Sequence, residues 1–494
     1  MKKLILFLLI VGLTSQSFAQ FKLSGNMANI TKADTFYINT PYIYGYYHDN
    51  DIAIPMDEKG NFNTVLDISE QKFGNIRLAN KEITLLLKPG KSLVMNYVPA
   101  DSSITFNGTA APENRLLNKL DLNSIPFFAK DNSFAKLTMP QLQQEVIAVW
   151  EATRNDEIAL VQASALPTRD KRLIIQEVKA NYILQLNYFA RGIMDRQVRA
   201  RIDSFVLAVY NNIPLAPDVL PAGPMYYNFA NSYIGYQETQ IFSALTPEKF
   251  QDPSTFLPKY GLTIDSGNRV AKIKGKFYIN WLLVRNTFPG NVAESWLAQS
   301  IFARCSTKDL AYAKPLMDEL TLHYPNSKYL PYLTKKIKVL ETLLQQNISN
   351  KEIIIADGYE KLSSIFPVIS KLKGKVVYLD VWGTWCGPCK DELRYNAALK
   401  QRFAGKDVAY VYLDMDDDMR DADWRQFIKV NGMTGLHLRK NSKNMEQFWE
   451  ELMPKGQRYY PMYFIFDKDG KLVKANAKRP SDKLDLYSQI QQYL

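Results

Sequence analysis

Apolar and polar residues follow three different patterns along the chain, one after another. From residue 21 to about 110 the apolar residues form short, partly alternating runs such as FKLSGNMANI and EITLLLKPGKSLVMNYV, separated by Gly, Asn, Asp and Pro. Alternation with a period of two is typical of half-buried β-strands, and DEKGNF and KPGKS are typical turns between strands. We therefore predict an antiparallel β-sandwich-like domain over residues 20–110.

From about residue 112 to 345 the apolar residues recur at three- and four-residue spacing, which is typical of amphipathic helices. Examples are MPQLQQEVIAVWEATRNDEIALVQASAL, TRDKRLIIQEVKANYILQLNYFARGI and RQVRARIDSFVLAVYNNI. The sequence contains no fixed repeat period, so it predicts an α-helical domain over residues 111–350 rather than a solenoid. An irregular break within it is marked by Pro214, Pro217, Pro221 and Pro224.

Beyond residue 350 the predicted strands and helices alternate. KVVYLDVW and DVAYVYLD are continuous apolar runs of the kind found in buried parallel strands. CKDELRYNAALKQRFAG predicts one helix ending at Gly405, and PMYFIFDKDGKLVKANA predicts a hairpin. SDKLDLYSQIQQYL predicts a last helix capped by Ser481 or Asp482. This order predicts an α/β layered domain over residues 351–494, which we expect to fold on its own.

The beginning of the chain, MKKLILFLLIVGLTSQSFAQ, has the layout of a secretory signal peptide. Two lysines precede an apolar run over residues 4–13, and small residues follow at Ser17 and Ala19. A short membrane anchor is the alternative, although the apolar run is brief for a bilayer span. We expect cleavage after Ala19 and a periplasmic protein without a transmembrane segment in the mature chain.

The charge pattern does not favour a nucleic-acid partner. Lys and Arg number 61 and Asp and Glu 50, which gives a formal net charge of +11. The basic residues are dispersed, without a long Lys/Arg block or a zinc-finger spacing, so nucleic-acid binding is not expected.

Two of the three cysteines stand in VWGTWCGPCKDEL, residues 381–393. The spacing of Cys386 and Cys389 fits a metal site, a structural disulfide or thiol–disulfide exchange. A structural zinc site needs four ligands, whereas the three histidines are isolated in the sequence. A structural disulfide across so short a loop constrains little unfolded-chain entropy. Thiol–disulfide exchange is therefore the favoured hypothesis, with no metal and no cofactor beyond the dithiol itself.

Exchange requires a thiolate, and the residues around the pair favour one. Cys386 stands where a buried strand turns into a helix, so free N–H groups and the helix dipole stabilise its negative charge. Gly387 and Pro388 form the tight turn, with proline where a missing N–H costs nothing. Cys389, one turn further, is placed to attack a mixed disulfide and release the partner. Cys305 lies in an apolar helical stretch, where we expect a buried thiol without a redox role.

Two carboxyl groups flank the dithiol. Asp380 lies six residues before Cys386, within the predicted buried strand. Burial raises the pKa of an acid, so we expect Asp380 to accept the proton of Cys389. Glu392 lies one helical turn beyond Cys389 and either shares this role or is an ordinary surface residue of the helix.

The sequence VVYLDVWGTWCGPCKDEL resembles the thioredoxin superfamily, in particular the TlpA/ResA-like periplasmic thiol–disulfide oxidoreductases with the signature W-x-T-W-C-x-P-C-x-x-E. The resemblance covers residues 352–494 and implies a thioredoxin fold. It implies that Cys386 is the nucleophile, Cys389 the resolving cysteine, Glu392 the family glutamate and Asp380 the buried aspartate. The β-rich front resembles the domain that precedes thioredoxin domains in many exported Bacteroidetes proteins.

The same resemblance extends to RYYPMYFIFDKDGKL, where Pro461 matches the cis-proline that faces the dithiol. The ordinary alternative is a proline that begins a strand. The chain departs from the family at Arg394, where a proline is usual, so a straighter helix is expected. It departs again before Pro461, where a small residue is common, which predicts a narrower groove. The segment GLHLRKNSKNMEQFWEELMPKGQ is longer than a minimal thioredoxin needs and is a further candidate to line the substrate groove. The residues implied for the substrate groove are Trp385, Gly387, Pro388 and Tyr460.

Two functional hypotheses follow. The first is an exported thiol–disulfide oxidoreductase that reduces disulfides of envelope proteins through its CGPC dithiol and receives electrons from a membrane-bound thiol. The second is an envelope protein whose N-terminal domains bind a glycan or peptide, with an accessory redox-sensing domain. Its candidate stacking platform is a tyrosine cluster, although aromatic residues are also common in ordinary strand packing. The cluster consists of Tyr42, Tyr44, Tyr46 and Tyr47.

Overall fold

The computed structural model describes residues 20–28, 34–43, 48–78, 81–195, 198–210 and 223–494. The predicted signal peptide lies outside the described residues, and so do Tyr44, Tyr46 and Tyr47. The chain divides into two compact units, Met1–Gln251 and Asp252–Leu494. This boundary falls inside the predicted helical segment, and the three predicted domain ranges stay a prediction.

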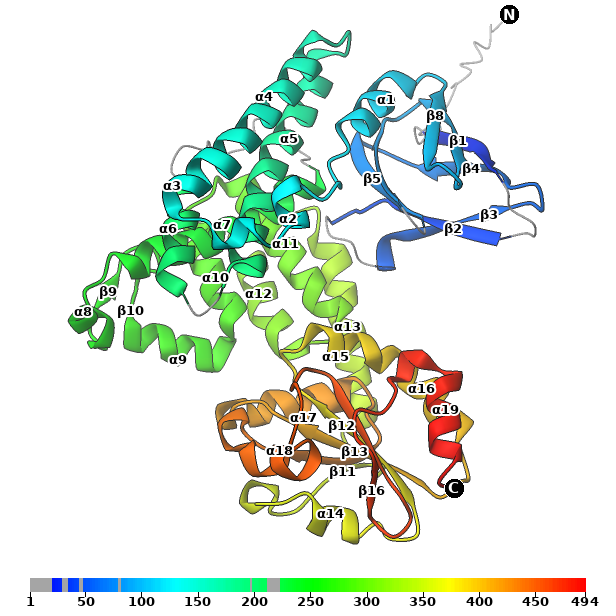
Figure 1. Cartoon of the computed structure of the whole chain (residues 1–494), viewed down its shortest axis with the longest axis vertical. Coiled ribbons are helices and arrows are strands. Elements are labelled where there is room, and N and C mark those ends of the chain that lie inside the picture. The colour runs from blue at the N-terminus through cyan, green and yellow to red at the C-terminus, as the bar shows by residue number, and fades with distance from the viewer. Residues whose placement is uncertain (1–19, 29–33, 44–47, 79–80, 196–197, 211–222) are drawn as a thin grey trace, which may run out of the picture. The chain divides into compact units, whose positions relative to one another are not determined.

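The β-rich part of the first unit consists of two four-stranded sheets with the strand orders β4-β1-β7-β8 and β3-β2-β5-β6. Apolar residues of both sheets share one buried core, among them Phe21, Phe36 and Leu85, so the two sheets form a sandwich (Figure 1). Its strands are β1 (Gln20–Met27), β2 (Asp34–Asn39), β3 (Asp51–Met56), β4 (Asn61–Asp67), β5 (Lys72–Arg77), β6 (Glu82–Leu87), β7 (Ser92–Val98) and β8 (Ser103–Asn107).

Helices complete the first unit. Three prolines of the predicted irregular break, Pro214, Pro217 and Pro221, lie outside the described residues. The fourth, Pro224, is the first residue of the long helix α7, and proline is favoured in the first turn of a helix. The helices are α1 (Ala111–Leu120), α2 (Phe127–Lys130), α3 (Met139–Gln141), α4 (Ala148–Ala163), α5 (Thr168–Tyr188), α6 (Arg199–Tyr210), α7 (Pro224–Ser243) and α8 (Pro247–Gln251).

The second unit begins with a short hairpin, which is followed by five helices. Of these, α12 and α13 pack against α17 (Asp421–Val430) of the C-terminal α/β domain. The elements are β9 (Phe256–Leu257), β10 (Leu262–Thr263), α9 (Ile264–Lys274), α10 (Lys276–Arg285), α11 (Gly290–Ser306), α12 (Leu310–His323) and α13 (Leu330–Asn347).

The α/β domain has one six-stranded sheet with the order β11-β14-β13-β12-β15-β16. The first four strands in this order pair in parallel, whereas β15 and β16 are antiparallel. The strands are β11 (Ile353–Ile355), β12 (Val376–Trp382), β13 (Val408–Asp414), β14 (Gly435–Arg439), β15 (Met462–Phe466) and β16 (Leu472–Lys474).

Helices cover both faces of this sheet (Figure 1). Residues of α17 and α18 join one apolar core, and residues of α16 and α19 join the other. Two buried layers around a central sheet explain why β12, the strand KVVYLDVW, is buried along its whole length. The helices are α14 (Phe366–Ser370), α15 (Gly387–Glu392), α16 (Asn396–Arg402), α17 (Asp421–Val430), α18 (Glu446–Leu452) and α19 (Leu484–Gln491).

The predicted order of β-rich, helical and α/β segments is confirmed, but two local predictions are wrong. The single helix expected after the dithiol is divided into α15 and α16 by a 3-10 turn at Leu393–Tyr395, so the missing family proline does not give a continuous helix. Neither Ser481 nor Asp482 caps the last helix, because Lys483 occupies that position and no side chain bonds there. The helix predicted to end at Gly405 ends at Arg402, with Phe403 as its C-cap, and Gly405 lies in the turn that follows, with a positive φ of 73°.

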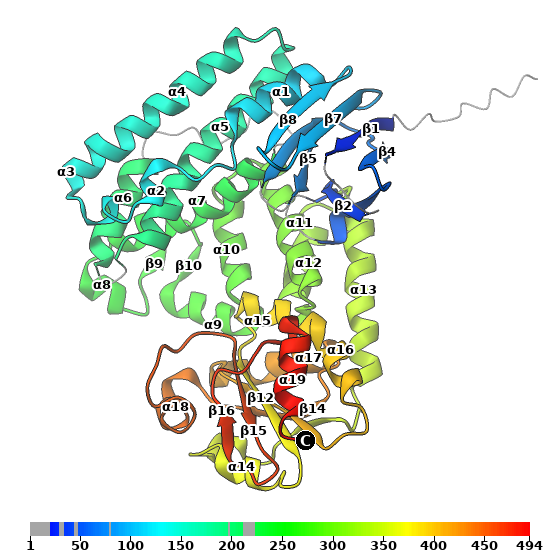
Figure 2. The same ribbon diagram turned by 45° about the vertical axis from the view of Figure 1, so that its right-hand side comes forward.

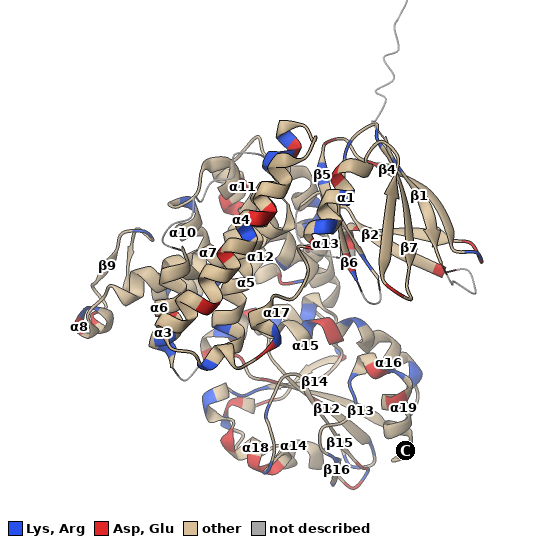
Figure 3. Ribbon diagram, turned by 45° about the horizontal axis from the view of Figure 1, so that its top comes forward, with Lys and Arg blue, Asp and Glu red and all other residues tan. Residues whose placement is uncertain are grey.

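Two further features of the described residues are the hydropathy of the helices and the distribution of charged residues. None of the helices in the described ranges is long and apolar enough to cross a membrane. Stretches of basic and of acidic residues are scattered over the helices and strands drawn in Figure 3, in agreement with the dispersed charges of the sequence.

Candidate functional site

The dithiol lies at the junction of β12 and α15, where the sequence analysis placed it. Cys386 is the N-cap residue of α15 and is joined to Cys389 by a disulfide. The backbone N–H of Cys389 donates to the Cys386 sulfur at 3.1 Å, so a helix N–H points at this sulfur. Gly387 and Pro388 form the first turn of α15. This N–H is available to a thiolate on Cys386 when the disulfide is reduced.

Aromatic side chains stand beside the disulfide. Trp385 is 49% exposed, whereas the two cysteines are almost fully buried. The Trp385 and Tyr460 rings are in an edge-to-face arrangement at a centroid distance of 5.3 Å, and the Trp449 ring of α18 lies 6.0 Å from the Tyr460 ring. Tyr460 therefore contacts two tryptophans, and α18 brings part of the long predicted lining segment to this place.

Pro461 lies close to the end of β12. The Tyr460–Pro461 peptide bond is cis, and β15 begins at the next residue, Met462, which pairs with Val381. The dithiol loop leaves β12 at Trp382, directly after Val381, so strand pairing brings Pro461 to the loop that carries the cysteines.

Asp380 is buried in β12, between Tyr412 of β13 and Tyr463 of β15. Its Oδ1 atom accepts no hydrogen bond from any described residue. Burial raises the pKa of Asp380 well above its usual value, the neighbouring charge of Glu392 raises it further, and the Lys400 ammonium opposes the shift. Asp380 therefore holds a proton more strongly than an exposed aspartate does.

Glu392 is buried, so the surface-residue interpretation of this position is wrong. Ser481 binds both of its carboxylate oxygens: the Ser481 backbone N–H donates to Oε2 and the hydroxyl to Oε1, each at 2.9 Å. Ser481, which the sequence suggested as a helix cap, thus binds the acid at the end of α15.

The loop before the dithiol is anchored by Asp416, two residues beyond the end of β13. The Thr384 N–H donates to Asp416 Oδ1 at 2.9 Å and the Thr384 hydroxyl donates to Oδ2. Burial raises the pKa of Asp416, whereas the two bonds from Thr384 lower it. Because Thr384 stands two residues before Cys386, Asp416 anchors the loop that leads to this cysteine.

The remaining candidates carry no comparable chemistry. Cys305 is buried in α11 and is not part of the Cys386–Cys389 disulfide. His437 is buried and stacks on Tyr412, and burial lowers its pKa to about 4. Within the described residues, no group of three or more His, Cys, Asp or Glu side chains is placed to hold a metal ion.

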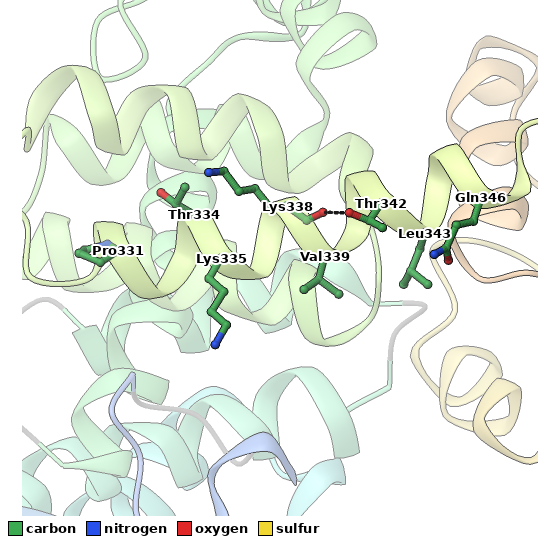
Figure 4. A pocket seen from close by; sticks show the side chains of 8 residues that line it. All are labelled: Pro331, Thr334, Lys335, Lys338, Val339, Thr342, Leu343 and Gln346. Carbon is green, nitrogen blue, oxygen red and sulfur yellow. Dashed lines mark hydrogen bonds between the residues drawn. The ribbon is translucent and has the colours of Figure 1, made fainter.

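A surface pocket lies along α13 (Figure 4). Thr342 donates to the carbonyl oxygen of Lys338 within the same helix. The described lining offers ammonium, hydroxyl and apolar groups without a thiol or a carboxylate, so redox chemistry is not supported there. The lining residues are Pro331, Thr334, Lys335, Lys338, Val339, Thr342, Leu343 and Gln346.

Known proteins resemble the part of the chain that holds this site. The family model Redoxin matches residues 368–490. The thioredoxin-like protein YneN of Bacillus subtilis is 34% identical over 155 residues, which are 29% of this chain and 87% of that protein. The chain belongs to the thioredoxin superfamily. The disulfide motif and the homologues together identify residues 368–490 as a TlpA/ResA-like domain.

The other relatives match a similar share of this thioredoxin-superfamily chain. The thiol-disulfide oxidoreductase ResA of Bacillus thuringiensis strain Al Hakam is 33% identical over 107 residues, 22% of this chain and 57% of that protein. The chain thus spans little more than half the length of this ResA relative. The crystallised thioredoxin domain of a thiol-disulfide oxidoreductase from Bacteroides vulgatus is 23% identical, covering 25% of this chain and 81% of that one, with a TM-score of 0.22.

The predicted site residues of the thioredoxin-like domain lie in β12, in the loop after it, in α15 and directly before β15. The sequence analysis missed Asp416 and the role of Ser481. Asp416 follows a buried strand at the same edge as the dithiol, a position that often holds functional side chains in α/β folds. Ser481 gave no such signal, because it lies 89 residues from Glu392.

Proposed function

We propose that this chain is a periplasmic thiol–disulfide oxidoreductase that reduces disulfides of exported proteins through Cys386 and Cys389. The observation that carries the proposal is the disulfide at the start of α15, with a helix N–H on the Cys386 sulfur and a buried, proton-holding Asp380 in the adjoining strand. In this proposal the Cys386–Cys389 pair is the redox-active group, and no separate cofactor takes part.

The reaction proceeds in two exchanges. The Cys386 thiolate attacks one sulfur of a substrate disulfide, a mixed disulfide forms, and the other substrate sulfur leaves as a thiolate that takes a proton from water. The ionised form of the Asp380 carboxyl then takes the proton of Cys389, and the Cys389 sulfur attacks the Cys386 sulfur. The second substrate sulfur leaves, so two electrons have moved to the substrate and the chain holds the Cys386–Cys389 disulfide.

The oxidised chain must be reduced again before another turnover. A membrane-bound thiol in the envelope supplies the two electrons by the same exchange in reverse. We place the partner-binding groove beside Trp385 and Tyr460, since the exposed Trp385 directly precedes Cys386 and its ring contacts Tyr460. Because the Tyr460 side chain is bulky and contacts two tryptophans, we expect the groove to favour partners with a slender extended segment around the disulfide.

Trapping with single cysteine variants tests the function. The reduced Cys389→Ser variant should accumulate mixed disulfides through Cys386 when it is incubated with disulfide-containing envelope proteins, and Cys386→Ser should abolish insulin reduction. Cys305→Ser is the matched control and should retain wild-type activity, because this thiol is buried in α11. A Cys389→Ser variant that traps no partner, or an equal loss of activity in Cys305→Ser, would contradict the proposal.

A further inference from the structure

A buried ion pair joins the active-site helix α15 to the helices that precede the thioredoxin-like domain. The Lys390 ammonium lies 3.0 Å from Asp309 Oδ2, and the two side chains are 9% and 5% exposed. Both residues belong to the second compact unit. Figures 1 and 2 show α15 on the side of the domain that adjoins α12.

Asp309 precedes α12 directly and occupies its N-cap position. Aspartate is among the favoured N-cap residues because its carboxylate accepts N–H bonds from the first helical turn. The Asp309 side chain makes no such bond and instead accepts from Lys390. The Asp309 carboxylate therefore binds a side chain of the active-site helix α15 and does not cap its own helix α12.

Lys390 is close to the dithiol along α15. It follows Cys389 directly, and its N–H donates to the Cys386 carbonyl oxygen at 3.2 Å. Residues four apart share one face of a helix, with Cβ atoms about 5–6 Å from each other. A cation at this position stabilises a thiolate on Cys386, and a carboxylate bound to the cation cancels much of that effect.

The surroundings of the pair are rich in cations. The Arg420 guanidinium lies over the Tyr312 ring, 4.2 Å from its centroid. Burial lowers the pKa of Lys276, and the positive charges of Arg304, Lys390 and Arg420 lower it further, while Asp309 opposes them. Asp309 is thus an anion among several cations next to the active-site helix.

We propose that Asp309 is a positioning residue of the redox centre. By holding and neutralising Lys390, it gives the helices before the thioredoxin-like domain a share in setting the thiol–disulfide equilibrium of Cys386 and Cys389. The inference rests on the proposed function only in that the dithiol must be able to open and close. It makes the helical segment of the second unit part of the redox centre.

The test measures the equilibrium constant of the full chain with glutathione, with reduced cysteines counted after tagging with a maleimide polymer. Asp309→Asn leaves the Lys390 charge uncompensated, and this charge stabilises a thiolate on Cys386. The equilibrium constant should therefore shift about three- to tenfold toward the reduced dithiol. Tenfold corresponds to about 30 mV for this two-electron couple. Lys390→Gln should shift the equilibrium the other way, and the double variant should return within about twofold of the wild type.

A second measurement separates electrostatics from general loosening. In Asp309→Asn, the alkylation of Cys386 should reach half its maximal rate at a lower pH than in the wild type, and the double variant should restore this pH. Glu341→Gln is the matched control, since it breaks an exposed ion pair with Lys314 and should change neither readout.

Three results would overturn the proposal: a folded Asp309→Asn chain with wild-type equilibrium, a double variant that keeps the Asp309→Asn shift, or a Glu341→Gln chain that shows it too. If Asp309→Asn does not fold, Lys390→Gln and the double variant decide, and an unchanged equilibrium in Lys390→Gln contradicts the proposal. The equilibrium with glutathione can be measured even if the chain reduces no protein substrate. Failure of the proposed function can therefore be distinguished from failure of this inference.

Discussion

Asp380 and Glu392 are two buried carboxyl groups with different surroundings. Asp380 has an oxygen without any hydrogen bond from the described residues, whereas both oxygens of Glu392 accept bonds from Ser481. Burial and the neighbouring charge of Glu392 raise the pKa of Asp380 well above its usual value. Asp380 therefore holds its proton to a higher pH than an exposed aspartate does.

The pH dependence of partner release follows from Asp380. Its raised pKa means that the fraction of Asp380 able to accept the Cys389 proton grows as the pH rises through that value. We expect Asp380→Asn to slow mixed-disulfide resolution at least about tenfold and to flatten this limb of the pH profile. Stopped-flow tryptophan fluorescence measures the step, and an Asp380→Asn profile that still rises like the wild type would exclude Asp380 as the acceptor.

The same group has a consequence for stability. Its folded pKa lies above the ordinary 3.8, so the folded chain binds this proton more tightly than the unfolded chain does. The free energy of unfolding therefore falls as the pH rises from about 3.8 through the folded value. Asp380→Asn should remove this pH-dependent fall in the free energy of unfolding. At pH values above the folded pKa of Asp380, the variant should therefore be more stable than the wild type. Urea unfolding from pH 4 to pH 9 checks the sign.

Ser481 should be tested by removing only its hydroxyl. Ser481→Ala takes one donor from the buried Glu392 carboxylate, and a hydrogen bond to a charged group contributes about 1.5–3 kcal/mol. We expect the free energy of unfolding to fall by roughly that amount. Ser481→Thr keeps the hydroxyl and is the control. Equal losses in both variants would show that packing, and not the bond to Glu392, determines the effect.

The sequence predicted the site residues that share a local motif and not those that arrive from distant segments. Cys386, Cys389 and Asp380 lie within a strand and the following turn, so spacing alone relates them. Ser481 lies 89 residues from its partner Glu392, and Asp309 lies 81 from Lys390. Single polar residues on separate helices carry no pattern that foretells their pairing, because tertiary packing selects the partner.

At the scale of elements, periodicity predicted long segments well and helix ends poorly. The apolar run of β12 is a strand buried along its whole length, as expected. The helix after the dithiol is interrupted at Leu393–Tyr395, although its sequence contains no proline or glycine there. The final helix begins after a turn in which Asp482 accepts from the Arg479 N–H, so the expected capping side chains are engaged elsewhere.

One helix start in the first unit is satisfied from another helix. Glu177 of α5 accepts the backbone N–H groups of Gly223, Met225 and Tyr226 at the start of α7. Such groups have no partner within their own helix. A Cβ atom on Gly223 would overlap the Glu177 carboxylate, although the φ of −98° is open to any residue. Glycine is therefore required here by close approach and not by backbone conformation.

This contact gives a prediction with a matched control. Gly223→Ala should displace the Glu177 carboxylate and lower the free energy of unfolding by about 2–3 kcal/mol, through overpacking and lost charged hydrogen bonds. Gly290→Ala places a methyl group in open space at the start of α11 and should be neutral or stabilise by about 0.4–1 kcal/mol. Urea unfolding of both variants decides, and equal effects would contradict the role of Glu177.

At the scale of the molecule, the sequence predicted the order of three kinds of segment but not how the helices divide. Amphipathic periodicity runs on both sides of the boundary at residue 251, so it marks no division there. Helices α12 and α13 pack against α17, and this packing joins the last predicted helices to the thioredoxin-like domain within one compact unit. In the sequence, the apolar faces of these helices have the same amphipathic pattern as other helices, so they do not show which helix they pack against.

The expectation that residues 351–494 fold alone can now be put to a comparative test. A fragment of residues 252–494 retains α12, α13 and Asp309, whereas residues 351–494 expose the contact surface of α17 and the Lys390 side chain. We expect the shorter fragment to unfold at least about 5 °C lower, since a loss of 1–2 kcal/mol shifts the Tm of a domain this size by several degrees. Its glutathione equilibrium should move in the direction expected for Asp309→Asn, but less, because water and salt screen an exposed ammonium. Calorimetry and maleimide tagging of both fragments measure these effects. Identical Tm and equilibrium in the two fragments would mean that the helices before residue 351 contribute nothing to the redox centre.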